Sequence, residues 1–280
     1  MMTDFQKRID KAKKLIEKAD CVIIGAGAGL STAAGFEYSG QIFDKYFSDF
    51  KEKYGFNDMY SGGFYPFKTQ EEKWAYWSRY VYLNRYKNKD NKLYKKLLDF
   101  VQSKDYFVIT TNVDHQFQLA GFDKNRLFYM QGDYGLFQCS LPCHNKTYDN
   151  EKQILNMVEK QKDMKIPASL IPKCPVCGRD MEMNLRSDER FVQDEGWYQH
   201  ARLYNDFIEK SNDKFRVLIE IGVGYNTPGI IKFPFEQMTF YNEKTYLIRI
   251  NKEYATCPRE IRDKTILFNE DVEMILNNLK

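Results

Sequence analysis

The sequence predicts an α/β fold in which a mostly parallel, doubly wound sheet is interrupted by a small inserted module. Three observations lead to this prediction. Short apolar runs alternate with helical patterns along most of the chain, the first run enters a glycine cluster, and two close cysteine pairs break the alternation between residues 132 and 184. Strands of a parallel sheet are continuous apolar runs because helices cover both of its faces.

The first unit combines a helical pattern over residues 5–19 with an apolar run at 21–24 that leads into glycine. This order is typical of the opening unit of a Rossmann-like, nucleotide-binding fold. Residues 40–68 are rich in Phe, Tyr, Gly and Asp without a sustained period, so we predict a flexible loop or a small subdomain there. Further strands are predicted at 106–110, 127–130, 216–221 and 245–250, and helices at 70–86, 93–101, 197–211 and 270–279.

Composition excludes several classes of protein. The net charge of +3 is too small to indicate nucleic-acid or membrane-surface partners. No apolar run approaches the roughly 20 residues of a membrane span, and residues 1–14 carry no secretory signal pattern. Six cysteines in 280 residues are too few for a disulfide scaffold, so we expect a reducing, cytoplasmic location.

The glycine cluster Gly25-Ala26-Gly27-Ala28-Gly29-Leu30-Ser31 is the first candidate ligand site. Small residues let a backbone approach a phosphate, and the N-terminus of the next helix favours negative charge. A tight strand-to-helix turn also needs glycine without any ligand, so both interpretations stay open. Asp44 and Asp49 lie at the distance of the ribose-binding acid of dehydrogenases, but neither ends an apolar strand, which argues against hydride transfer.

The cysteine pairs Cys139-x3-Cys143 and Cys174-x2-Cys177 predict one structural zinc ion per chain. Two short chelating loops complete a tetrahedron, and four thiolates leave no open position for chemistry. The alternative, four unconnected thiols, requires both spacings to arise by coincidence.

Several motifs, in this order, resemble those of sirtuins. Residues Gly27–Gly35 resemble the sirtuin NAD loop Gly-Ala-Gly-x-Ser-x-x-Ser-Gly, and Thr110–Asp114 resembles Thr-Gln-Asn-Ile-Asp, with Thr111 in place of the glutamine. The cysteine module follows Gly132 as the sirtuin zinc ribbon follows His-Gly. The resemblance implies NAD as co-substrate, bound by Gly27, Ala28, Gly29, Ser31, Thr32, Thr111, Asn112, Asp114, Gln131, Gly222, Val223 and Asn251.

The resemblance also implies a division into domains. Residues 1–131 and 185–280 form the NAD-binding, Rossmann-like domain, with 40–68 as a flexible cofactor loop that orders when NAD binds. Residues 132–184 form the zinc-binding module. A monomer is expected, because sirtuin catalytic cores are often monomeric.

Departures from the sirtuin pattern indicate the chemistry. Gln131 replaces the catalytic histidine, and Leu185-Arg186-Ser187-Asp188 replaces the acyl-peptide segment Val-Val-x-Phe-Gly-Glu. This combination resembles the bacterial class M sirtuins, which are associated with protein ADP-ribosylation of lipoylated carrier proteins. Glutamine can hydrogen-bond a ribose hydroxyl but cannot act as a general base, so deacylation should be impaired. Transfer of ADP-ribose to a protein side chain, with release of nicotinamide, is therefore favoured.

The catalytic candidates are Asn112, Asp114 and Gln131. In this hypothesis Asn112 positions the nicotinamide ribose or a water, Asp114 orients the nicotinamide amide and Gln131 holds the ribose hydroxyls. Arg186 would contact an acidic or modified protein substrate. As simpler interpretations, Asn112 and Asp114 form a turn and cap the next helix, and Arg186 is a solvated charge. A weak NAD-dependent deacylase, a non-catalytic NAD sensor and an NAD hydrolase are the alternative functions.

Two histidines receive no role from the sequence. His115 and His200 have no identifiable partner, and we expect both to be ordinary residues of polar faces.

Overall fold

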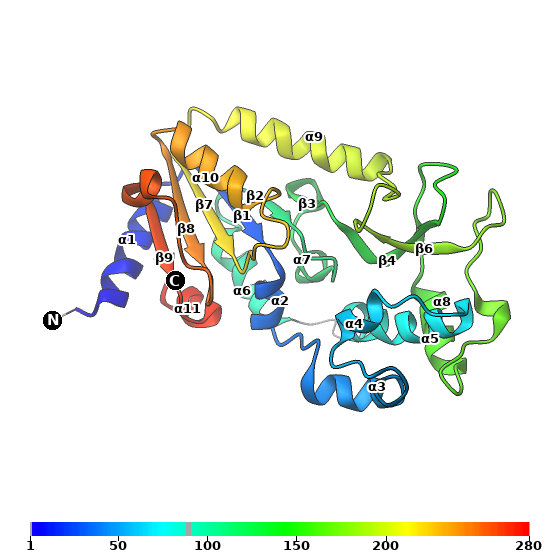
Figure 1. Ribbon diagram of the computed structural model, residues 1–280. Coiled ribbons are helices and arrows are strands. Elements are labelled where there is room, and N and C mark those ends of the chain that lie inside the picture. The colour runs from blue at the N-terminus through cyan, green and yellow to red at the C-terminus, as the bar shows by residue number, and fades with distance from the viewer. Residues whose placement is uncertain (1, 88–90, 280) are drawn as a thin grey trace.

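A six-stranded parallel sheet forms the main body of the computed structural model, which describes residues 2–87 and 91–279 (Figure 1). The strand order is β3-β2-β1-β7-β8-β9, and every pairing is parallel. The strands are β1 (Cys21–Ala26), β2 (Asp105–Thr110), β3 (Leu127–Tyr129), β7 (Arg216–Ile221), β8 (Thr245–Ile250) and β9 (Thr265–Phe268). The predicted doubly wound fold is confirmed.

Helices cover both faces of this sheet, as the apolar strands require (Figure 1). Val22 and Ile24 of β1 pack in one core and Ile23 in another, because successive side chains of a strand point to opposite faces. The first core contains α1 (Asp4–Lys18), α2 (Ala28–Ala33), α6 (Lys92–Val101), α7 (Gln116–Ala120) and α11 (Val272–Leu279). The opposite face of the sheet packs against α9 (Glu195–Lys210) and α10 (Lys232–Tyr241).

The N-terminal helix illustrates how local sequence sets an element. Thr3 accepts a hydrogen bond from the Gln6 amide and so caps α1. Ile9, Ala12 and Ile16 follow at spacings of three and four and are buried, which gives the helix one apolar face.

The order of the strands reverses between β1 and β7. From β1 the chain proceeds through β2 to β3 at one edge, and from β7 through β8 to β9 at the other. Ligands of open α/β sheets bind at the carboxyl ends of the strands where the order reverses. Gly27 and Gly222 follow β1 and β7 directly, so the fold places both glycine turns at this point.

A second, smaller core lies beside the parallel sheet. Its antiparallel sheet has the order β5-β4-β6, with β4 at Gly132–Cys139, β5 at Tyr148–Asp149 and β6 at Met181–Leu185. This sheet packs with α8 (Glu151–Lys160) and with α5 (Gln70–Val81), which ends in the π-helical turn Tyr82–Tyr86. Residues 40–86, grouped with the parallel sheet in the sequence analysis, thus share a core with the cysteine module.

Residues 40–68 form helices where we predicted a loop or small subdomain. They contain α3 (Gly40–Tyr54) and α4 (Met59–Gly63), so the interpretation as a loop is wrong and that as a small subdomain fits. Phe43, Phe47 and Phe50 are fully buried at spacings of four and three, with the rings of Phe43 and Phe47 stacked at 5.4 Å. Ordering of this segment by NAD stays a prediction.

The other predicted elements are confirmed with small shifts at their ends. The sequence analysis placed neither the helices α8 and α10 nor the strands β4, β5, β6 and β9. Pro234 lies in the first turn of α10, where proline is tolerated, so it does not break the helix there. Short 3-10 turns at Lys124–Arg126, Ala168–Leu170 and Arg259–Lys264 complete the structure. Within the described residues, no helix combines the length and the apolar character needed to cross a bilayer.

Candidate active site

A cleft of about 1240 Å³ opens at the carboxyl ends of β1, β2 and β7, between the two cores. This volume exceeds the roughly 300–1,000 Å³ of common small-molecule sites, so a dinucleotide fits its size. Every residue that the resemblance assigned to NAD lines this one cleft, from Gly27 in the first turn to Asn251 after β8. Gln131 and Arg186 line it too, whereas the four cysteines of the predicted zinc site do not.

Two backbone turns are packed directly together in the wall of the cleft. The Gly27 amide donates to Ile221 O at 3.0 Å, and the Gly29 amide donates to Gly222 O at 2.9 Å. A Cβ at Gly29 would lie 2.7 Å from the Gly222 Cα, and Gly222 itself has a φ of +62°. These glycines are therefore required by contact between the turns even without a ligand, and the same contact shapes the wall for a close-approaching phosphate.

Asn112 is held against this wall by its side chain. Its Nδ2 donates to Gly27 O at 3.0 Å and to the Tyr94 hydroxyl at 3.3 Å, while its backbone amide donates to the Thr110 hydroxyl at 3.0 Å. The Tyr94 hydroxyl also lies 3.1 Å from Ser31 Oγ. The turn after β2 and the turn after β1 are thus fastened together by polar contacts within the cleft.

Asp114 serves both the cleft and the helix that follows it. It is buried, accepts a hydrogen bond from Ser31 Oγ at 2.5 Å, and accepts another from the Gln116 backbone amide at 3.1 Å. The second contact closes a turn onto the first residue of α7, as the turn in the simpler interpretation expected, whereas the N-cap position of α7 belongs to His115, whose side chain makes no capping bond. Burial, assisted by the charge of Asp133, raises the pKa of Asp114 in spite of the bond from Ser31.

Gln131 and Arg186 lie side by side on the module side of the cleft. Gln131 precedes β4, Arg186 follows β6, and the Arg186 amide donates to Gln131 O at 3.1 Å. Gln131 is half-buried and Arg186 is exposed. The antiparallel pairing of Gly132 with Leu185 explains their proximity, because it aligns the start of one strand with the end of the other.

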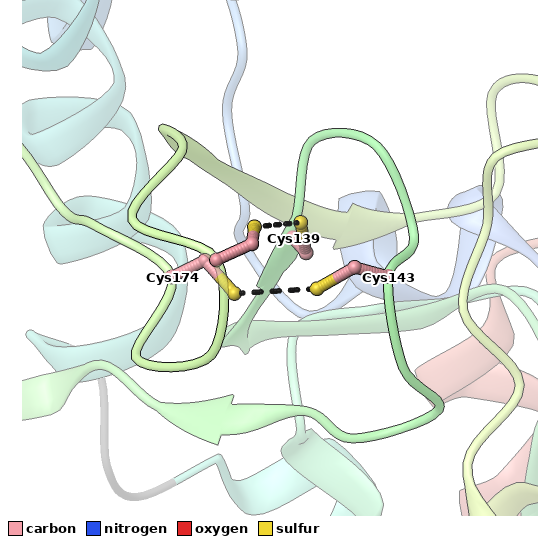
Figure 2. A group of neighbouring side chains, drawn as sticks. Cys139, Cys143 and Cys174 are labelled. Atoms are coloured by element: carbon pink, nitrogen blue, oxygen red, sulfur yellow. Dashed lines mark hydrogen bonds between the residues drawn. The ribbon is translucent and has the colours of Figure 1, made fainter.

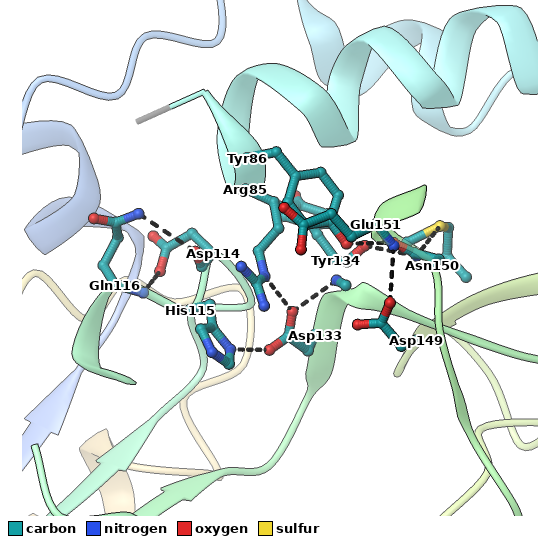
Figure 3. Close-up of polar contacts among 12 residues, drawn as sticks. Arg85, Tyr86, Asp114, His115, Gln116, Asp133, Tyr134, Asp149, Asn150 and Glu151 are labelled. Atoms are coloured by element: carbon teal, nitrogen blue, oxygen red, sulfur yellow. Dashed lines mark hydrogen bonds and ion pairs between the residues drawn. The ribbon is translucent and has the colours of Figure 1, made fainter. Parts of the chain in front are cut away.

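Four polar residues near the cleft were given no role from the sequence: Tyr94, His115, Asp133 and Arg85. Tyr94 has no local signal, because a tyrosine on an amphipathic helix is ordinarily a packing residue. His115 forms an ion pair with Asp133, and Asp133 also pairs with Arg85, so the expectation that His115 is an ordinary polar-face residue is wrong (Figure 3). His200 bonds to the carbonyl of Gly196 in its own helix and packs against the ring of Tyr129, as an ordinary residue would.

The four predicted zinc ligands converge at the far end of the small sheet (Figure 2). Their sulfur atoms all lie within 4.8 Å of one another, with Cys139 and Cys177 at 3.6 Å and Cys143 and Cys174 at 3.7 Å. Zinc bound tetrahedrally at about 2.3 Å requires sulfur atoms about 3.8 Å apart. The cluster therefore fits a zinc ion, and four thiolate ligands that leave no open position fit a structural role.

Comparison with known proteins identifies relatives of this chain. No protein-family model matches the chain. A protein ADP-ribosyltransferase of Staphylococcus aureus (strain Mu50 / ATCC 700699) is 38% identical over 277 residues, which cover 99% of this chain and 88% of the relative. A Fusarium oxysporum f. sp. cubense protein, "Probable bifunctional ADP-ribose hydrolase/ADP-ribosyltransferase", is 31% identical over 259 residues, 88% of this chain but only 42% of the longer relative.

Solved structures support the fold. A Sir2 homologue bound to 2'-O-acetyl ADP ribose matches with a TM-score of 0.64 at 17% identity, over 96% of this chain and 94% of its own. A complex of Sir2, a p53 peptide and NAD+ matches with a TM-score of 0.59 at 18% identity, over 97% and 96%. The nearly full-length relative at 38% identity places the chain in a family of protein ADP-ribosyltransferases, and its fold is that of the Sir2 sirtuins.

Proposed function

We propose that this enzyme transfers ADP-ribose from NAD to a protein side chain and releases nicotinamide. The observation that carries the proposal is the amide of Gln131 at the cleft position where the resemblance expects a histidine base, on the same cleft as Asn112 and Asp114. Cleavage of the bond between nicotinamide and ribose C1′ leaves positive character on C1′. A carboxylate acceptor attacks that carbon without losing a proton, so no base is needed in this step.

The three catalytic candidates supply positioning and electrostatics. Asn112 is rigidly held by Gly27 O and Tyr94, which favours it as the residue that orients the nicotinamide ribose. Asp114 is fixed by Ser31 and orients the nicotinamide amide. Gln131 hydrogen-bonds the ribose hydroxyls but has no titratable nitrogen to activate them.

Arg186 is proposed to recognise the target protein. Among the charged residues at this end of the cleft, Lys73 pairs with Glu182 and Arg190 pairs with Asp188. Arg186 is exposed and has no side-chain partner among residues 2–87 and 91–279. An unpaired guanidinium at the mouth of the cleft favours an acidic group on the target.

We further propose a lipoylated carrier protein as the target. The resemblance to class M sirtuins suggests it, and the aromatic wall of the cleft supports an apolar modified side chain. Phe64 is 79% exposed and Tyr60 44% exposed, and both line the cleft near Trp77. Zinc in the four-cysteine cluster, a monomeric state and a cytoplasmic location complete the proposal.

Labelled NAD tests the reaction. The protein, a cell lysate and NAD labelled in the adenosine half are incubated, and the fate of the label is followed. Label retained on protein supports transfer. Free ADP-ribose alone would instead support hydrolysis, O-acylated ADP-ribose deacylation, and intact NAD a sensor.

The role of Gln131 has its own variant. Gln131→Ala should lower transfer while NAD binding by calorimetry is largely kept, and Gln131→His should regain some deacylation. Gln41→Ala is the matched control, because Gln41 is exposed and outside the cleft. Full transfer by Gln131→Ala would contradict the assigned role.

A further inference from the structure

Asp133 is a buried carboxylate on which three segments of the chain converge (Figure 3). It is only 4% exposed. Its Oδ1 accepts hydrogen bonds from Arg85 Nε at 2.9 Å and from the Gly135 amide at 2.7 Å, and its Oδ2 pairs with His115 Nδ1. Both carboxylate oxygens therefore have partners, which a buried charge requires.

The partners of Asp133 come from different parts of the fold. His115 directly follows Asp114 in the turn after β2, Asp133 lies in β4 two residues after Gln131, and Arg85 lies in the π-helical turn beyond α5. The contacts thus join the cleft turn of the parallel sheet to strand β4, which begins directly after Gln131, and to the helices of the second core.

The charges of His115 and Arg85 favour their contacts with Asp133. Burial by itself raises the pKa of Asp133, but the hydrogen bond and charge of His115 and the charge of Arg85 outweigh it, so the pKa is lowered. Asp133 therefore remains an acceptor for both partners. The charge of Asp133 also acts on Asp114, a second acidic group nearby.

His115 has a strained backbone conformation that the contact of its side chain with Asp133 stabilises. Its φ of +65° places a non-glycine residue in the left-handed region, which costs about 1 kcal/mol or more unless the surroundings hold it. The pair with Asp133 holds it. Neither His115 nor Asp133 lines the cleft, so neither is placed to touch a substrate.

We propose that His115, Asp133 and Arg85 form a latch that sets the position of Asn112 and Asp114 relative to Gln131. These are positioning residues that act through the catalytic candidates, and the proposal rests on the roles given to those candidates above. Opening the latch should leave the NAD wall intact, because Gly27, Gly29 and Gly222 hold each other independently of it.

Substitutions at His115 separate the side chain from the strain. Glycine and asparagine accept a positive φ, so His115→Gly removes the side chain without adding strain, and His115→Asn keeps a donor for Asp133. We expect His115→Gly to lower kcat on the order of 10- to 100-fold with little change in the calorimetric Kd for NAD. His115→Asn should recover part of kcat, and His200→Asn should match the parent.

Nicotinamide release and label transfer are both measured, so that the two proposals can fail separately. Release of nicotinamide without label on protein would refute the transfer of ADP-ribose to protein. The rate of nicotinamide release in the variants would still test the latch. Parent-like kcat in His115→Gly would overturn the latch, as would a kcat in His115→Asn no better than in His115→Gly. A parent that releases no nicotinamide would overturn both proposals.

Discussion

Gly29→Ala tests whether the two glycine turns form one wall for the dinucleotide. The added Cβ would lie 2.7 Å from the Gly222 Cα and 3.0 Å from its carbonyl oxygen. Non-bonded carbons rest about 3.5–4.0 Å apart, so the two backbones must separate by about 1 Å. Overpacking of this kind costs about 1–3 kcal/mol, which in a chain of this size lowers the melting temperature by roughly 2–12 °C.

The same displacement should weaken NAD binding. The hydrogen bond between the Gly29 amide and Gly222 O aligns the turn from which a phosphate would accept hydrogen bonds. Losing one bond to a charged group costs about 1.5–3 kcal/mol, or about 10- to 150-fold in Kd. Calorimetry with NAD and thermal unfolding measure the two effects. Gly229→Ala is the control, since its Cβ would meet nothing within 4 Å and it lies outside the cleft. Parent-like melting and affinity in Gly29→Ala would refute this reasoning.

Three further predictions concern the zinc cluster and the floor of the cleft. Purified native protein should contain about one zinc ion per chain. Cys174→Ser should lose the metal and unfold at a lower temperature, whereas the control Cys257→Ser should keep the metal. Native protein without zinc would refute the metal assignment. Tyr94→Phe deletes the hydroxyl that contacts Asn112, so it should cost about 1–3 kcal/mol of stability and slow transfer; unchanged melting and rate would show that the contact is dispensable. Burial raises the pKa of Asp114, so folding disfavours the ionised form of this carboxyl group. The unfolded carboxyl titrates at about pH 4. The parent therefore loses stability as the pH rises from that value through the raised pKa of the folded state. Asp114→Asn should therefore gain stability relative to the parent across that window and hold the gain above it, while its transfer falls; a stability difference that shrinks with rising pH would be the wrong sign.

Much of the architecture could be predicted because its signals are local. A strand buried on both faces is mostly an apolar run: Cys21–Ala26 is one throughout, and Arg216–Ile221 is apolar except for the buried residues Arg216 and Glu220. Two cysteine pairs with chelating spacing need only a turn each to aim their sulfur atoms. The helix α3 was missed although Phe43, Phe47 and Phe50 follow a helical period, because the glycine-rich and aromatic residues around them obscured it.

The predicted cofactor residues form one cleft for a reason that a sequence motif does not contain. Gly27, Asn112, Gln131 and Asn251 are far apart along the chain, and the reversal of strand order at β1 and β7 brings them together. The motifs named the residues through resemblance. The sheet topology decided that they share a site.

By itself, the sequence determined the kinds of chemistry available: glycine turns, an amide in place of a histidine base, and four thiolates at zinc spacing. Only the tertiary structure decided what holds them in place. Tyr94 bonds Asn112 from a distant helix, and Asp133 joins His115 to Arg85 across three segments. Such contacts depend on side chains that meet only after the helices and strands have packed, because a hydrogen bond depends on separation in space and not on separation along the chain.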